Sequence, residues 1–343
     1  MSTNPISKVC IYGAGAIGGW IGAGLAAQGC QVSVVARGAT LAALKADGLR
    51  LQSAAGDKPA AAWPVTACED PAALGVQDLV VVAVKAPSLL DVARQIAPLI
   101  GPHTMVLTAM NGVPWWFFNG FGGTLAGTRL AAVDPTGEIG AAIRPEHVIG
   151  CVVHASCSLD GPGQVRHHFG NGLIIGEPAG GSTPRVEALA ALLVRAGFNA
   201  TVSAQIQKDA WYKLWGNMTV NPVSALTGAT TDRIMNDALV RGFISTVMRE
   251  AKAIGARIGI PIDQEPEDRH QVTRKLGAFK TSMLQDVEAG RAVELDALVG
   301  VVRELGQLTG TPTPFTDALL GLARLHARVH GLYPAEARGN PAP

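Results

Sequence analysis

A short apolar run that leads directly into three closely spaced glycines constrains the fold of this 343-residue chain most. Residues 8–12 read KVCIY, which is typical of a buried strand, and residues 13–18 form a G-x-G-x-x-G motif. Helix-like apolar spacing continues to Gly29, where a helix is expected to end, and a second strand is expected at residues 31–37. The pattern therefore predicts one βαβ unit at the start of a parallel sheet.

The same stretch is also the chain's one candidate for a membrane span, because no charged residue lies between Lys8 and Arg37. A span needs about 20 apolar residues, and Gly18 with Gly22 matches a helix-pairing G-x-x-x-G motif. Against a span, the stretch is rich in glycine and breaks into a strand, a turn and a helix. It also lacks the basic leader and small-residue cleavage site of a secretion signal. We expect a soluble, cytoplasmic protein.

Composition argues against several other classes of protein. The chain has 28 basic and 27 acidic side chains and no long block of either sign, so it lacks the basic face of a nucleic-acid binder. Its five cysteines are odd in number and form no C-x-x-C pair. This pattern predicts free thiols in a reducing compartment.

The rest of the chain divides into two parts. Apolar strand-like runs at residues 78–86 and 104–112 flank a helix-like segment, and shorter strands after about residue 150 could extend the sheet with antiparallel edge strands. Beyond residue 203 almost every segment has a helical pattern. The expected helices are residues 207–220, 236–258, 263–289, 294–308 and 315–330. We predict an α/β Rossmann-type doubly wound domain at residues 1–204 and an all-α domain at residues 205–343.

The glycine motif predicts a dinucleotide site. Its residues are Gly13, Ala14, Gly15, Ala16, Ile17 and Gly18. In this context the glycines allow a tight turn, close approach of the pyrophosphate and close helix–sheet packing. NAD-specific sites usually carry an acidic residue at the end of the second strand, whereas this chain carries Arg37, which suits the 2′-phosphate of NADPH/NADP⁺. Alternatively, the glycines only allow close packing in a core and bind no dinucleotide, and Arg37 is only a solvated surface residue.

The segment AWYKLWGNMTVNP contains the most informative polar pattern of the second half. Lys213, Asn217 and Asn221 are spaced by four, so on a helix they share one face among apolar neighbours. A buried polar stripe is costly unless its groups are satisfied, which favours a binding site. Alternatively, Lys213 reaches solvent and Asn221 ends the helix before Pro222. In isolation, Ser282 and Glu294 read as routine cap or exposed positions.

The sequence does not predict a metal site. His326 and His330 are four residues apart, but Ala327 stands where the H-E-x-x-H motif requires glutamate. We expect these histidines to lie on a solvated helix face.

Taken in order, several motifs resemble those of the ketopantoate reductase (2-dehydropantoate 2-reductase) family. The resemblance runs from Lys8 to about Leu325, and its segments are the glycine motif, Arg37, VAVKA, MNG, KLWGNMTVNP, TSMLQD and GRAVELD. It implies an N-terminal Rossmann domain, an all-helical C-terminal domain and an active site between them. It also implies NADPH-dependent reduction of a 2-oxo acid, with ketopantoate reduced to pantoate in pantothenate biosynthesis.

The resemblance also implies a role for each matching residue. Lys213 would be the general acid, and Glu294 would bind the substrate hydroxyl and help to position the lysine. The implied substrate-binding residues are Asn111, Asn217, Asn221 and Ser282. The implied cofactor contacts outside the glycine motif are Lys85 and Asn111 near the nicotinamide and Arg37 at the 2′-phosphate. A homodimer is left open.

Two departures from the family pattern leave the substrate open. Four consecutive aromatics, Trp115–Phe118, follow the MNG motif, and Phe279 stands where we expect a polar substrate-binding residue. Both changes predict a more apolar pocket, so a paralogous reductase of a bulkier 2-oxo acid is one alternative. A β-hydroxyacid dehydrogenase-like enzyme is a second, although the G-R-x-x-E-x-D block argues against it. A non-catalytic NADP(H)-sensing protein is a third, although Lys213 and Glu294 are both present.

Overall fold

The protein is described by a computed structural model that covers residues 5–53 and 60–335. The chain divides into two compact units. The first unit comprises Met1–Arg129 and Asp134–Ala210, and the second comprises Leu130–Val133 and Trp211–Pro343.

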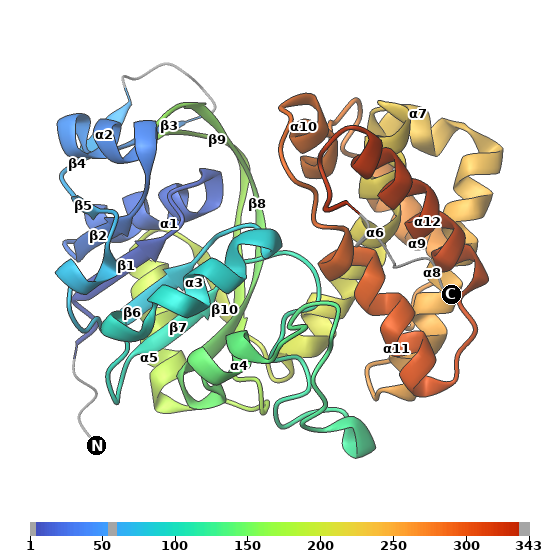
Figure 1. Ribbon diagram of the computed structural model, residues 1–343, viewed down its shortest axis with the longest axis horizontal. Coiled ribbons are helices and arrows are strands. Elements are labelled where there is room, and N and C mark those ends of the chain that lie inside the picture. The colour runs from blue at the N-terminus through green and yellow to red at the C-terminus, as the bar shows by residue number, and fades with distance from the viewer. Residues whose placement is uncertain (1–4, 54–59, 336–343) are drawn as a thin grey trace, which may run out of the picture. The chain divides into compact units, whose positions relative to one another are not determined.

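The first unit is built on one mixed sheet (Figure 1). Its strands are β1 (Lys8–Tyr12), β2 (Gln31–Val35), β3 (Leu49–Ser53), β4 (Ala61–Trp63), β5 (Thr66–Cys68), β6 (Leu79–Val82), β7 (Met105–Thr108), β8 (Val148–Gly161), β9 (Gln164–Gly176) and β10 (Asn199–Val202). Their order is β4-β3-β9-β8-β7-β6-β1-β2-β5, and β10 pairs with β9. Strand β1 pairs in parallel with β2 on one side and with β6 on the other. The chain therefore changes direction across the sheet at β1, where doubly wound folds bind their ligands.

Helices and short helical turns accompany these strands. The α-helices are α1 (Ala16–Ala27), α2 (Gly38–Asp47), α3 (Leu89–Gln95), α4 (Glu138–Ala142) and α5 (Pro184–Arg195). The 3-10 turns are η1 (Pro71–Ala73), η2 (Ala86–Ser88), η3 (Ala97–Leu99), η4 (Gly123–Leu125) and η5 (Pro145–His147). The predicted order of strand, glycine turn, helix and strand is confirmed by β1, α1 and β2.

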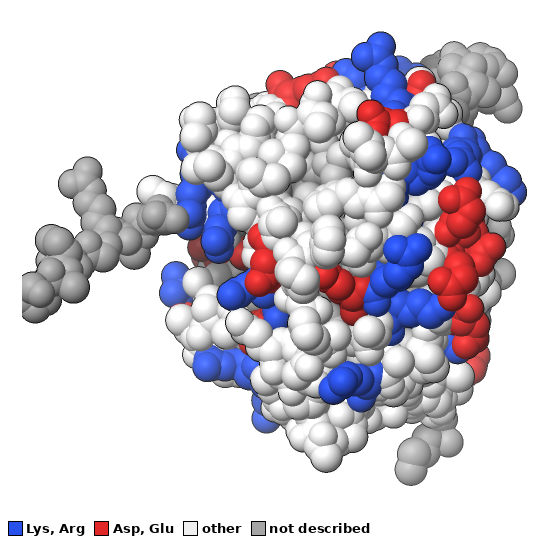
Figure 2. All heavy atoms as spheres, turned by 90° about the vertical axis from the view of Figure 1, so that its right-hand side faces the viewer, with Lys and Arg blue, Asp and Glu red and all other residues white. Residues whose placement is uncertain are grey.

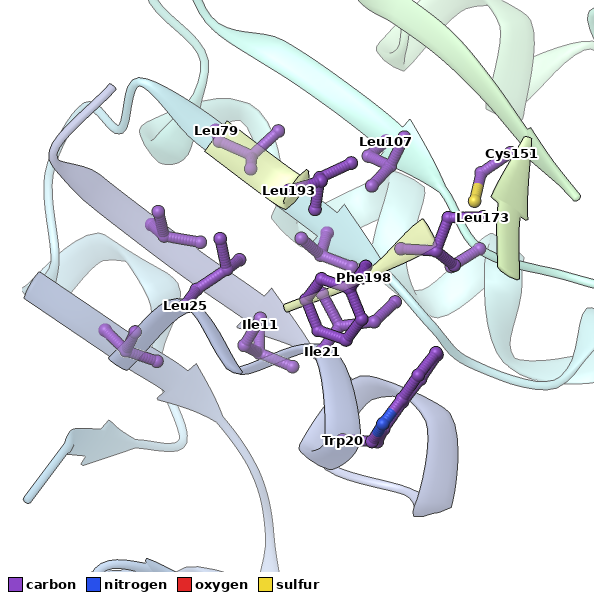
Figure 3. Packing of buried hydrophobic residues seen from close by; sticks show 14 of the residues in the cluster. Ile11, Trp20, Ile21, Leu25, Leu79, Leu107, Cys151, Leu173, Leu193 and Phe198 are labelled. Carbon is purple, nitrogen blue, oxygen red and sulfur yellow. The ribbon is translucent and has the colours of Figure 1, made fainter. Parts of the chain in front are cut away.

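The glycines of α1 have a packing role beyond the turn. A Cβ on Gly19 would lie 2.5 Å from Val165 of β9, and one on Gly22 would lie 2.9 Å from Ile11 of β1. Figure 3 shows side chains of α1 packed among the core residues of the surrounding strands. Small residues are therefore required on several sides of α1, because the first unit encloses this helix. No helix in the described parts of the chain is long and apolar enough to span a membrane.

We expect Gly24→Ala to lower the free energy of unfolding by about 1–3 kcal/mol through overpacking. The added Cβ would lie 2.5 Å from Cζ of Phe198, a ring that is buried and stands edge-on to Trp20 at 4.7 Å. Gly242→Ala is a matched control, because Gly242 is also helical but has no atom within 4 Å of an added Cβ. The control should gain up to about 1 kcal/mol from helix propensity. Urea unfolding of both variants checks the difference, and equal effects would contradict this packing account.

The strands after residue 150 differ from the sequence expectation. Strands β8 and β9 form a long antiparallel hairpin of 14 and 13 residues in the interior of the sheet, and β8 also pairs in parallel with β7. The expected antiparallel pairing is confirmed, but the expected short length and edge position were wrong, because β3 and β4 pair beyond β9 and occupy that edge.

The second unit contains helices and no strand among its described residues. These helices are α6 (Ile206–Thr227), α7 (Thr231–Asn236), α8 (Ala238–Arg257), α9 (Pro266–Arg274), α10 (Ser282–Glu288), the π-helix η6 (Asp296–Gly300), α11 (Val301–Thr309) and α12 (Pro314–Val329). The predicted combination of a Rossmann-type domain and an all-α domain is confirmed. The boundary between the compact units falls inside α6, after Ala210.

Two helix predictions require correction. The helix expected to end at Val220 continues through Pro222 to Thr227. The single helix expected at residues 263–289 is two helices, because the chain leaves helical geometry between α9 and α10. Helix α9 begins at a capping box in which Glu265 and Asp268 each bind the other residue's backbone N–H.

Candidate active site

The glycine turn joins β1 to α1 in a conformation that suits a phosphate. Gly13 has a φ of +101°, which favours glycine, and Gly15 is the N-cap of α1. No side chain caps this helix, and its first turn contains no acidic residue. An added Cβ on Gly15 would have no atom within 4 Å. The turn therefore combines open space with the backbone N–H groups and positive dipole end that bind a pyrophosphate.

Gly18 has a different function from Gly15. A Cβ on Gly18 would lie 2.1 Å from the carbonyl oxygen of Gly13 and 3.0 Å from Cβ of Ala83. Gly18 is therefore needed so that α1 can pack against the turn and the sheet. Ala14, Ala16 and Ile17 complete the turn and the first residues of α1.

Arg37 follows β2 and is the N-cap of α2. Its side chain is exposed and makes no hydrogen bond or ion pair with the described residues. Helix α2 has no capping side chain and no acidic residue in its first turn. An exposed guanidinium beside an uncapped helix N-terminus suits a phosphate group.

Lys85 and Asn111 follow the next two strands of the sheet. Lys85 precedes η2, three residues after β6, and Asn111 lies three residues after β7. Both side chains are half-buried. Strands β2, β1, β6 and β7 are neighbours and parallel, so the glycine turn, Arg37, Lys85 and Asn111 all follow the carboxyl edge of the sheet.

Helix α6 holds the polar stripe of the second unit. Lys213 and Asn217 are half-buried and Asn221 is buried, while Trp211 and Trp215 anchor the helix in the core. The indole of Trp215 donates a hydrogen bond to the carbonyl of Met248, 2.7 Å away. Because α6 continues past Pro222, Asn221 lies inside the helix and does not end it.

Arg269 of α9 contacts α6 beside the polar stripe, and the sequence did not indicate this contact. Its guanidinium lies 5.5 Å from the ring centre of Tyr212, and Gly216 leaves it room against α6. Burial lowers the pKa of Arg269, and Tyr212 partly opposes the shift. Arg269 thereby packs α9 against α6. Its two contacts on α6, Tyr212 and Gly216, directly precede Lys213 and Asn217 in the sequence.

The S-M-x-Q-D and G-R-x-x-E-x-D segments contain two aspartates that make contacts within the second unit and one glutamate that is a candidate for the active site. Asp286 is buried and pairs with Arg291 at 3.0 Å, and Asp296 accepts a hydrogen bond from the hydroxyl of Tyr333 at 2.6 Å. Glu294 is a buried carboxyl group two residues before the π-helix η6. Irregular helical geometry of this kind is frequent at functional sites.

Ser282 is the first residue of α10, and the preceding residue, Thr281, is its N-cap. The Thr281 hydroxyl accepts a hydrogen bond from the N–H of Leu284 at 3.2 Å, so the Ser282 side chain is not needed as the cap. Ser282 is exposed and Phe279 is half-buried.

The described residues contain no cluster of side chains that could form a metal site. The five cysteines form no disulfide bond, and no three His, Cys, Asp or Glu side chains among the described residues are grouped to hold an ion. His326 and His330 lie with ring centres 4.2 Å apart on α12.

Comparisons with known proteins identify the family. The family model described as ketopantoate reductase PanE/ApbA matches residues 9–116, and the model of the family's C-terminal part matches residues 205–327. A 2-dehydropantoate 2-reductase of Mesorhizobium japonicum is 48% identical over 95% of this chain and 99% of its own length. The chain belongs to the ketopantoate reductase family.

Solved structures agree with this membership. A ketopantoate reductase family structure from Ralstonia solanacearum has a TM-score of 0.91 and 58% identity, and the match covers 96% of this chain and 100% of that one. A D-mandelate dehydrogenase structure with NADH and anilino(oxo)acetate has a TM-score of 0.79 and 22% identity over 95% of this chain and 99% of that one. The second match shows a shared fold.

The aromatic run that departs from the ketopantoate reductase pattern is part of a core. Trp115, Trp116, Phe117 and Phe118 are at most 6% exposed. The indole of Trp116 donates a hydrogen bond to the Thr108 hydroxyl at 3.1 Å, and the Phe117 and Phe118 rings stand edge-on at 5.4 Å. The expectation that this run makes an open pocket more apolar was wrong, because the rings pack against residues of the first unit.

Proposed function

We propose that the protein catalyses the NADPH-dependent reduction of ketopantoate (2-dehydropantoate) to pantoate. As a member of its family the chain is a NAD(P)-dependent oxidoreductase. The observation that carries the proposal is the Lys213–Asn217–Asn221 stripe on α6, in a chain 48% identical over nearly its full length to a protein named 2-dehydropantoate 2-reductase. We assign residues 1–204 to cofactor binding and residues 205–343 to substrate binding and proton transfer.

The reaction adds a hydride to C2 of the 2-oxo acid and a proton to its carbonyl oxygen. NADPH supplies the hydride when bound. As the new C–H bond forms at C2, the carbonyl π electrons move to oxygen, and the Lys213 ammonium stabilises this charge and donates the proton. A general acid placed in this way contributes a factor of about 10²–10⁴ to the rate.

The remaining residues of the second unit orient the substrate in this proposal. Asn217 and Asn221 offer amide donors that stabilise a developing oxyanion without adding a charge of their own. Glu294, which is buried just before η6, binds the substrate hydroxyl and helps to position Lys213. The exposed Ser282 hydroxyl at the start of α10 supplies a further hydrogen bond to the substrate.

The first unit holds the cofactor in this proposal. The Gly13–Gly18 turn binds the pyrophosphate, and Lys85 and Asn111 lie at the nicotinamide end. Asn111 also contacts the substrate. Arg37 and the uncapped start of α2 bind the 2′-phosphate and thereby select NADPH over NADH.

We expect Arg37→Ala to raise the KM for NADPH at least about 10-fold and to leave the KM for NADH nearly unchanged. A tenfold change corresponds to about 1.4 kcal/mol, within the range of one charge-assisted contact. Arg144→Ala is a suitable control, because Arg144 is an exposed arginine that pairs with Glu146. Equal losses for both cofactors would remove Arg37 from the 2′-phosphate site.

The substrate assignment is tested by comparing kcat/KM for ketopantoate and for an aryl-substituted 2-oxo acid, with NADPH absorbance as the readout. Because Trp115–Phe118 are buried, Phe279 is the one departure from the family pattern that still favours a larger apolar group. We expect a clear preference for ketopantoate. A preference for the aryl substrate would contradict the assignment of ketopantoate and would favour a bulkier 2-oxo acid as the substrate.

A further inference from the structure

The chain turns back sharply at the end of α12. Gly331 has a φ of +68°, and its N–H donates to the carbonyl of Arg328 at 3.0 Å. The N–H of Leu332 donates to the carbonyl of Ala327 at 2.7 Å, and both of these side chains are buried. The two bonds form a Schellman motif, which ends the helix and fixes the direction of the residues that follow. We call residues 331–334 the C-terminal strap.

The C-terminal strap is bonded to the segment that contains Glu294. The carbonyl of Leu332 accepts a hydrogen bond from the N–H of Val293 at 3.1 Å. The hydroxyl of Tyr333 donates to Oδ1 of Asp296 at 2.6 Å. One bond therefore lies directly before Glu294 in the sequence, and the other lies two residues after it. The strap holds both ends of the short segment that carries this carboxyl group.

Further contacts hold the partners of the Tyr333 hydrogen bond. Asp296 is the first residue of η6, and a Cβ added to Gly300 would lie 3.3 Å from its Oδ1, so the glycine leaves room for the carboxylate. The guanidinium of Arg328 lies 5.6 Å from the ring centre of Tyr333. Nε of the same arginine donates to the carbonyl of Pro334 at 3.2 Å. The tyrosine ring is therefore held beside the carboxylate that it contacts.

The side chain of the C-terminal strap that makes this bond is a neutral donor. Burial, together with the neighbouring Asp296 carboxylate, raises the pKa of Tyr333 to about 12, so its hydroxyl stays protonated near neutral pH. Figure 2 shows acidic and basic side chains close together on one face of the molecule. Ion pairs on such surfaces are weakened by salt. The strap depends instead on a neutral hydroxyl and a backbone N–H, so we expect it to hold over a wide range of salt concentration.

We propose that Tyr333 is a positioning residue, which acts through Asp296 to hold Glu294 where it binds the hydroxyl group of the substrate. This inference rests on the proposed function, in which Glu294 has that role. Glu294 is buried, and its carbonyl accepts the N–H of Leu298 at 3.2 Å, so its backbone is joined to η6. A shift of η6 would therefore move the carboxyl group, and a displacement of about 1 Å can cost about 10²-fold in rate.

The substrates that test this role are ketopantoate and 3,3-dimethyl-2-oxobutanoate, which differs from it only by lacking the hydroxyl group. The specificity ratio is kcat/KM for ketopantoate divided by kcat/KM for this analogue. In Tyr333→Phe the ratio should fall at least about 5-fold, because a displaced Glu294 loses a hydrogen bond that the analogue never makes. Asp296→Asn keeps an acceptor oxygen for Tyr333 and should keep most of the wild-type ratio. A general loss of stability would lower both values of kcat/KM and leave the ratio unchanged.

Thr316→Val is the matched control for Tyr333→Phe. It also removes a hydroxyl that donates to a carboxylate, in this case Glu250 at 2.7 Å, and it does so at the opposite end of α12. Both substitutions nearly preserve the shape of the side chain. The control should have the wild-type specificity ratio, and circular dichroism confirms that each variant is folded.

Amide hydrogen exchange, followed by NMR, provides a second readout that needs no turnover. Tyr333→Phe should speed the exchange of the Val293 and Leu298 amides at least about 5-fold, whereas the control should not. An unchanged specificity ratio or unchanged exchange in Tyr333→Phe would overturn the proposal. Failure of wild type to reduce ketopantoate would instead contradict the proposed function, and the exchange rates would still show whether the C-terminal strap holds the Glu294 segment.

Discussion

Replacing Lys213 with alanine should lower kcat for ketopantoate reduction by about 10³-fold, within the range of a lost general acid. The lysine lies in the middle of α6, on a face shared with two asparagines, and Trp211 and Trp215 fix the helix in the core. Removing the ammonium leaves the developing alkoxide without its proton donor. Stopped-flow measurement of NADPH oxidation at saturating substrate gives the effect on kcat directly.

The affinity for NADPH separates this role from a structural one. In the Lys213→Ala variant the Kd for NADPH should stay within about twofold of wild type, because the proposed cofactor residues lie in the first unit. Lys208→Ala is the matched control, since Lys208 is an exposed lysine on the same helix, and it should turn over normally. Near-normal turnover by the Lys213 variant would exclude it as the acid.

A second large effect is expected at the glycine turn, where two alanine substitutions should have opposite consequences. Gly18→Ala should destabilise the fold by more than about 3 kcal/mol, because its Cβ would lie 2.1 Å from the Gly13 carbonyl oxygen. Gly15→Ala should leave the free energy of unfolding unchanged, because Gly15 has a φ of −73° and open space around it. It should nevertheless weaken NADPH binding at least about 10-fold, because the methyl group occupies the place of the phosphates.

Thermal unfolding without ligand, together with NADPH titration by fluorescence, measures both consequences. The comparison is informative because the same substitution is made three residues apart. If Gly15→Ala binds NADPH as tightly as wild type, the pyrophosphate does not approach this turn. If Gly18→Ala is as stable as wild type, the turn is less tightly packed against α1 than the structure indicates.

Features encoded over short stretches could be predicted from the sequence. The β1–α1–β2 unit has a signal in each part, namely a β-branched run, a glycine turn and a helical apolar spacing. The polar stripe of α6 was visible because a spacing of four residues is close to the helical period of about 3.6 residues, so the three side chains fall on one side of the helix. Arg37 was expected at the end of the second strand, whereas β2 ends at Val35 and Arg37, two residues later, is the N-cap of α2.

Features that depend on distant contacts could not be predicted. The interior position of β8 and β9 is set by their pairing with β7 and β3, and strand partners carry no local signal. Trp115–Phe118 read as pocket residues because they follow Asn111, but burial depends on what the rest of the first unit packs around them. Arg269 and Tyr212 are more than fifty positions apart in the chain and lie on different helices, whereas sequence periodicity reports on one helix at a time.

Transfer of deuterium from NADPH labelled at C4 of the nicotinamide tests the central claim most directly. The purified protein is given ketopantoate and cofactor deuterated on each face in turn, and the product is analysed by NMR. If the protein is a ketopantoate reductase, one of the two labelled cofactors delivers its deuterium to C2 of pantoate, with one pantoate formed per NADPH consumed. Absence of pantoate, or pantoate without deuterium at C2 from either cofactor, would contradict it.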